Sequence, residues 1–167
     1  MDFTRRKMLS AAAASAMLPQ IARANTATEI KWDDLIPPGV AYSEIIGEGI
    51  MDERNDTWRP VFDANATKLN PALDGAYIKM PGFIIPLEQN AKGVSEFVLV
   101  PYVGACLHVP PPPANQLVFV KAKNPWPNDD LWEAVWVTGR MRHQLQSMEL
   151  AEVGYAMTAD AMETYIW

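Results

Sequence analysis

The amino-acid sequence predicts a mainly β protein: a small five-stranded Greek-key barrel of the OB type that follows an irregular N-terminal arm. Two observations support this prediction. Five short apolar segments separated by turn-forming residues follow residue 71, and glycines stand at the bends of the first and fourth segments. A small barrel must curve strongly, and glycine kinks are a common means of curving a sheet. An open antiparallel sandwich is the main alternative.

The five strands are predicted from runs rich in β-branched and aromatic residues, at residues 77–87, 97–101, 116–121, 134–142 and 153–158. Pro81 and Gly82 interrupt the first run. We expect a kink there, because proline donates no hydrogen bond to a ladder and glycine accommodates a bulge. Residues 159–165 are expected to form a closing helical turn, so that the barrel domain spans residues 71–167.

The segment before the barrel, residues 25–70, is predicted to be an arm that packs onto the domain. Prolines and glycines interrupt any helical period in it. A short helix is expected at residues 42–51, where three isoleucines fall near one face, although glycines weaken it. Trp32 and Trp58 are expected to anchor the arm on the barrel, with partner binding as the alternative role.

The first 24 residues have the features of an export signal. Arg5 and Arg6 precede a weakly apolar, alanine-rich run, and Ala22-Arg23-Ala24 supplies a small-x-small cleavage pattern. We interpret this as a twin-arginine-like leader, with an ordinary Sec signal as the alternative. Cleavage would leave a soluble periplasmic protein that begins at Asn25, without a cysteine at its new end for a lipid anchor.

Net charge and cysteine content exclude several classes of protein. The leader has a net charge of +3, so the mature chain has a net charge of −9 compared with −6 for the whole sequence. Such a surface repels phosphate backbones, and we expect no nucleic-acid partner. A single cysteine forbids an intramolecular disulfide, and no later segment is apolar over the roughly 18 residues that a membrane span needs.

The most informative motif is Gly104-Ala105-Cys106-Leu107-His108-Val109, followed by four prolines. The residue before a proline avoids helical angles, and a proline run prefers an extended helix, so the segment must be extended. Alternate side chains of an extended chain share a face, which brings Cys106 and His108 together. Three roles for this cysteine stay open: a packed thiol, a metal or redox group, and a catalytic nucleophile.

A metal site is one chemistry that this pair permits. Cys106, His108 and His143 are the whole supply of cysteine and histidine outside the leader, and they suit zinc, or Cu(I) with a methionine. Glu88 or Asp74 are further candidate ligands that nothing local selects. No catalytic residue is assigned, because positions i and i+2 seldom give the geometry of an activated thiolate.

The proline run is also a candidate interaction loop, since a stiff apolar segment loses little entropy when it binds. Its residues are Pro110, Pro111, Pro112, Pro113, Asn115 and Gln116.

The chain resembles a bacterial family of exported proteins of unknown function, marked by the motif G-A-C-x-H-V-P-P-P-P-x-N-Q at residues 104–116. The string Pro81 to Glu88 and the opening Trp32 to Pro37 are also similar to that family. The resemblance implies an association with MacB-like ABC transporters and zinc-responsive genes. We therefore expect a periplasmic, non-enzymatic accessory protein of a membrane ABC-type transport assembly, with a zinc or copper site. The alternative is a cysteine-dependent redox or hydrolytic enzyme that uses Cys106 and His108.

Overall fold

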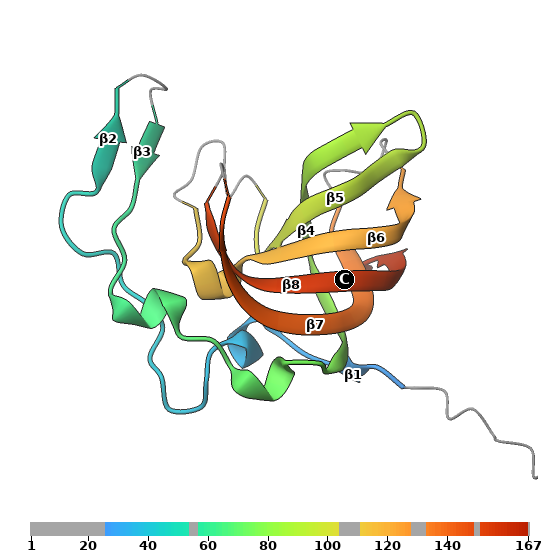
Figure 1. The fold of residues 1–167 in the computed structure, drawn as a ribbon, viewed down its shortest axis with the longest axis horizontal. Helices are drawn as coiled ribbons and strands as arrows, with labels where there is room; N and C mark the ends of the chain where they lie inside the picture. The colour runs from blue at the N-terminus through green and yellow to red at the C-terminus, as the bar shows by residue number, and fades with distance from the viewer. Residues whose placement is uncertain (1–25, 54–56, 104–110, 128–132, 149–150, 167) are drawn as a thin grey trace, which may run out of the picture.

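The structure is a computed structural model that describes residues 26–53, 57–103, 111–127, 133–148 and 151–166 (Figure 1). Its strands are β1 (Thr28–Glu29), β2 (Ile50–Asp52), β3 (Thr57–Arg59), β4 (Tyr77–Asn90), β5 (Gly93–Val100), β6 (Val118–Trp126), β7 (Val135–Ser147) and β8 (Glu152–Thr164). Four 3₁₀ turns are found among the described residues: η1 (Trp32–Leu35), η2 (Ala64–Thr67), η3 (Pro71–Leu73) and η4 (Ala114–Gln116). The predicted mainly β class is confirmed.

Five strands close into a barrel in the order β4-β5-β6-β8-β7, and β4 pairs with β7 to complete the circle (Figure 1). The β6–β8 pair is parallel, and the other pairs of the barrel are antiparallel. This is the strand order of the OB fold. The predicted OB-like barrel is confirmed, and the closing β4–β7 pair excludes the open sandwich.

Strand β4 changes pairing partners at its middle, and this change allows a sheet of five strands to close into a barrel. Its first half, Tyr77 to Gly82, pairs with β7, and its second half, from Phe83, pairs with β5. Gly82 stands at this change, where a Cβ atom would lie 2.7 Å from the Leu99 Cγ atom. The Pro81-Gly82 pair that predicted a kink therefore marks the corner of the barrel.

Side chains fill the interior of the barrel. From Tyr77 to Ile85, residues along β4 alternate between half-buried and buried, as expected for a strand with one face on a core, and the rest of the strand is exposed. The largest fully buried side chains of this cluster are Tyr155, Phe97, Leu35, Ile78, Met80, Leu99 and Met141. Strand β5 is also buried on its outer face, where Val98 and Val100 pack with Leu117 and Val153 in a second cluster.

The N-terminal arm is attached to the barrel by a buried tyrosine. The Tyr155 hydroxyl on β8 donates a hydrogen bond to the Leu35 carbonyl oxygen and accepts one from the Asn70 backbone N–H at 2.6 Å. Trp32 packs against the core, which confirms its predicted anchoring role. The same prediction is wrong for Trp58, which is not among the residues packed against the described core, is 37% exposed, and donates from its indole to the Glu48 carbonyl oxygen within the arm.

Two predicted helical segments are wrong. Residues 42–51 contain Gly47 and Gly49 with φ angles of 71° and 76°, which no right-handed helix accommodates, and the segment ends in β2. Residues 159–164 belong to β8, because pairing with β7 continues to Val135↔Thr164 and overrides the helix propensity of Ala159, Ala161 and Met162.

Candidate functional site

The predicted motif is only partly visible. Cys106, His108 and Pro110 lie outside the described residues, so the structure gives no contact for them. The visible part begins at Pro111, which is half-buried, and Pro112 and Pro113 are buried. Pro113 is also the N-cap residue of η4. The described prolines thus pack into the molecule and lead directly into η4, which is the end of the motif.

Asn115 and Gln116 of the predicted interaction loop have internal partners. The Asn115 Nδ2 atom donates to the carbonyl oxygens of Asn65, at 2.9 Å, and Lys68, at 3.3 Å. The Gln116 Nε2 atom donates to the Trp32 carbonyl oxygen at 3.1 Å. Both side chains are almost fully buried. They connect the end of the motif to the N-terminal arm, while a role for the loop in binding stays a prediction.

A cleft of about 460 Å³ lies where this part of the motif meets the arm and the turn between β7 and β8. Pro111 and Pro112 form part of its wall. The remaining lining residues are Arg59, Pro60, Phe62, Asp63, Ala66, Thr67, Ala114, Ser147, Met148, Ala151 and Glu152. This wall combines apolar side chains with charges of both signs.

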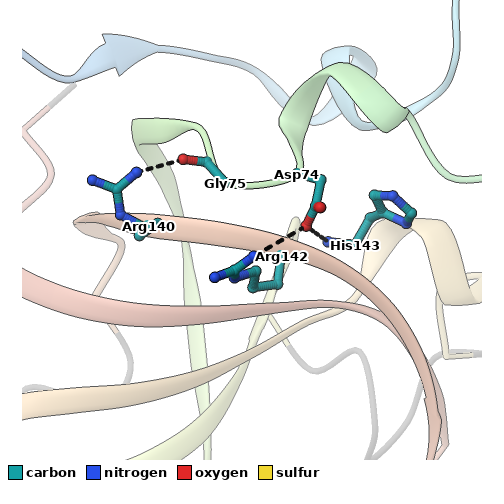
Figure 2. Close-up of polar contacts among 5 residues, drawn as sticks. All are labelled: Asp74, Gly75, Arg140, Arg142 and His143. Carbon is teal, nitrogen blue, oxygen red and sulfur yellow. Dashed lines mark hydrogen bonds and ion pairs between the residues drawn. The ribbon is translucent and has the colours of Figure 1, made fainter.

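His143 is found on β7, where it is exposed and lies opposite Tyr155 in the register with β8. Its backbone N–H donates to the Asp74 Oδ1 atom at 3.4 Å, and the Arg142 Nη1 atom lies 4.0 Å from the same oxygen (Figure 2). Arg140 donates instead to the Gly75 carbonyl oxygen at 2.6 Å. The contact between Asp74 and His143 therefore fixes the backbone rather than the imidazole.

The metal prediction is not tested by these positions. Within the described ranges, no group of three or more histidine, cysteine, aspartate or glutamate side chains is arranged to hold an ion. His143 is not among the residues that line the cleft, which receives Ser147 and Met148 from the end of β7. Two of the three predicted ligands lie outside the described residues, so the site stays a prediction.

Lysines on the barrel exterior are paired with acids. Lys123 lies 2.5 Å from Asp160, and a hydrogen bond from Lys123 lowers the pKa of the Asp160 carboxyl. Lys121 lies 2.8 Å from Glu96, and the hydrogen bond between them raises the pKa of Lys121. These exposed pairs contribute little to stability, but they neutralise cations on strand β6.

Sequence reasoning missed an exposed apolar feature, which we call the apolar hairpin and define as the described residues 44–53 and 57–63. It carries β2 and β3 and projects away from the barrel (Figure 1). Ile50 is 62% exposed and Met51 is 52% exposed. Its other exposed large apolar side chains are Ile45, Ile46 and Trp58. The spacing of the isoleucines resembled a helix face, and that periodicity concealed a hairpin.

Pairing within the hairpin extends beyond the two strands. Ile45 forms an isolated bridge with Phe62, and the Ile46 N–H donates to the Val61 carbonyl oxygen at 2.7 Å. Trp58 donates from Nε1 to the Glu48 carbonyl oxygen at 2.8 Å. The hairpin is therefore an ordered element that leaves large apolar groups in water.

The fold and the hairpin define an OB-type barrel protein with a projecting apolar surface. The chain belongs to the family described as "Protein of unknown function (DUF3299)", whose model matches residues 32–164. The resemblance predicted from the motif is confirmed at the level of an uncharacterised family. The part of the chain that the structure describes contains no helix with the length and hydrophobicity that a membrane crossing requires.

A crystal structure of a DUF3299 family protein from Pseudomonas aeruginosa PAO1 is similar to this chain. The two sequences are 35% identical and the TM-score is 0.69, over 85% of this chain and 98% of that chain. No curated protein was found to match. The comparisons show the family and the fold.

Proposed function

We propose that this chain is a periplasmic, non-enzymatic accessory protein that binds a membrane ABC-type transport assembly. The observation that carries the proposal is the apolar hairpin, an element that projects from the barrel (Figure 1) and has several large, exposed apolar side chains. Exposed apolar groups that gather on one ordered element are typical of protein–protein contact surfaces. The leader at residues 1–24 supports the location, and the family resemblance supports the transporter.

The barrel supports a role as a scaffold. Its interior is filled by side chains such as Phe97, Met80 and Tyr155, so the described core stabilises the fold. The cleft beside Pro111 and Pro112 is an outer surface that borders the base of the hairpin at Arg59 and Pro60. Because these residues belong to both the hairpin and the cleft, we propose that one partner binds across the two.

The metal is the second part of the proposal. Cys106 and His108 would supply a thiolate and an imidazole from one segment, and His143 would supply a second imidazole, for zinc or copper. Pro111 lines the cleft and follows Cys106 and His108 by a few residues in the sequence. A metal bound by those two residues would therefore be held by a segment that leads into the proposed binding surface.

Co-purification tests this proposal. Tagged mature chain and the double variant Ile50→Lys/Met51→Lys are each recovered from detergent-solubilised membranes of the expressing cells, with Leu87→Lys as control. Leu87 is an exposed leucine on β4 with 41% exposure. We expect the hairpin variant alone to lose an ABC-type transport component. Equal recovery of that component by all three proteins, or its absence from all three, contradicts the proposal.

Alkylation of Cys106 as a function of pH separates the proposal from an enzymatic role. A thiol that reacts rapidly well below its ordinary pKa would support a cysteine-dependent enzyme. Protection that a chelator releases would support the metal site.

A further inference from the structure

We infer that the apolar hairpin binds an extended, lysine- or arginine-rich segment of a partner protein, which adds as a strand to the free edge of β2. This inference rests on the proposed function and names the chemistry of the partner. The β2–β3 sheet has two strands, and β2 pairs only with β3 in the part of the chain that is described. Its other edge presents backbone donors and acceptors on which a strand can pair.

The β2 edge suits strand addition better than the β3 edge. Ile50 and Met51 are neighbours on β2, so their side chains point to opposite faces, and both are more than half exposed. An added strand would therefore meet an apolar side chain on each face. Strand β3 instead ends at Arg59, which repels a basic partner, and is followed by Pro60, which lacks a backbone donor.

The hairpin is preorganised for such a contact. The Trp58 indole bonds to the Glu48 carbonyl and covers Gly49, so the bend before β2 is fixed before any partner arrives. Met51 lies opposite Trp58 in the register, which places their side chains on the same face. A partner strand would extend this apolar pair at a low cost in ordering entropy.

Charge selects the partner. The described side chains of the hairpin include four carboxylates, Glu44, Glu48, Glu53 and Asp63, and one arginine, Arg59. An acidic surface repels anionic phospholipid headgroups, and it also repels the same hairpin of a second copy. A polypeptide with basic side chains complements the negative charge of the hairpin, and its own apolar side chains can pack on the exposed apolar residues.

Synthetic peptides provide the test. Mature chain is titrated into a fluorescent peptide that alternates valine and lysine, into the same peptide with glutamate for lysine, and into the lysine peptide with alternate backbone nitrogens methylated. We expect the lysine peptide to bind at least about tenfold more tightly than the glutamate peptide, and less tightly as salt is raised. Methylation should abolish binding, because it removes the donors of one edge.

Variants locate the site on the hairpin. Ile50→Lys/Met51→Lys should weaken lysine-peptide binding by about tenfold or more, while Leu87→Lys leaves it unchanged. Glu48→Gln/Glu53→Gln, which removes two exposed charges with little change in side-chain shape, should weaken binding and reduce its salt dependence. Circular dichroism of each variant should match the parent, since the substituted side chains of Ile50 and Met51 are exposed.

Three results overturn the inference: equal affinity for the lysine and glutamate peptides, sedimentation of the chain with phosphatidylglycerol vesicles through the hairpin, or a hairpin-dependent dimer in light scattering. If one of these occurs while the hairpin variant still loses the transport component, the inference fails and the proposed function stands. If neither peptide binding nor co-purification depends on the hairpin, both fail.

Discussion

The Trp58 indole donates a hydrogen bond to the Glu48 carbonyl oxygen at 2.8 Å, across the bend of the apolar hairpin. Gly49 lies beneath the same indole, where a Cβ atom would overlap the ring. Trp58 thus closes the bend while 37% of its side chain stays exposed. One side chain both stabilises the hairpin and contributes to the surface that we assign to partner binding.

Gly49→Ala should disturb the hairpin more than Gly47→Ala. Both glycines have positive φ, at 76° and 71°, so alanine is strained by about 1 kcal/mol at either position. Only at Gly49 would the added methyl group also displace Trp58, since no atom lies within 4 Å of a Cβ at Gly47. Hydrogen exchange of the Trp58 indole N–H, followed by NMR, should accelerate in Gly49→Ala alone. Equal acceleration in both variants would contradict the described packing.

Tyr155→Phe should lower the free energy of unfolding by about 2 kcal/mol or more, because the Leu35 carbonyl and the Asn70 N–H lose their shared partner. Tyr42→Phe is the control, since the Tyr42 side chain is half exposed. Urea unfolding measures both variants. Equal effects of the two substitutions would mean that Tyr155 does not hold the N-terminal arm on the barrel.

The same tyrosine makes the free energy of unfolding depend on pH in the alkaline range. Burial raises the pKa of Tyr155 from its ordinary value of 10.0 to about 12. Folding therefore favours the neutral phenol, and this contribution is complete below pH 10 and is lost as the pH rises from 10 through 12. Over that window, the free energy of unfolding should fall less steeply in Tyr155→Phe than in the parent chain. Parallel pH profiles would refute this account.

Asn115→Ala should destabilise the fold by about 1–3 kcal/mol, since the carbonyl oxygens of Asn65 and Lys68 lose the donor that connects them to η4. Gln146→Ala, at a half-buried position of β7, serves as the control. Thermal unfolding compares them. A change in Asn115→Ala no larger than in the control would leave Asn115 free to act as a binding residue.

The metal proposal predicts non-additive losses. Cys106→Ser and His108→Ala should each remove most zinc or Cu(I) affinity, and the double variant should lose little more, because both ligands come from one segment. His143→Ala should also remove most of the metal affinity only if β7 lies beside the motif. Affinity should also fall in acid, where the ligands must compete with protons. Competition with a chelator measures it, and binding weaker than about 10 μM would reject the site.

The barrel could be predicted from sequence because local signals agreed with the tertiary structure. Pro81-Gly82 and Gly139 stand where the barrel bends, and each glycine is crowded by backbone or side-chain atoms of a neighbouring strand. Strand ends were less predictable. Residues 159–164 favour a helix by composition and become strand only because β7 is long enough to pair with them.

The hairpin could not be predicted, because the signal of Ile45, Ile46 and Ile50 is the same for a buried helix face and for an exposed hairpin. Burial depends on whether another element covers the residues, and sequence periodicity does not contain that information. Likewise, the sequence predicts that Asn115 and Gln116 are loop residues. In the structure their side-chain amides donate hydrogen bonds to carbonyl oxygens of the N-terminal arm, more than 40 residues away in sequence.

Photo-crosslinking in living cells tests the central claim most directly. A benzoylphenylalanine is placed at position 51 on the hairpin or at position 87 on the barrel, and crosslinked products are identified by mass spectrometry. We predict that position 51 crosslinks to a component of a membrane ABC-type transport assembly and that position 87 does not. Crosslinks at position 51 to no such component, or equal crosslinking at the two positions, would contradict the account.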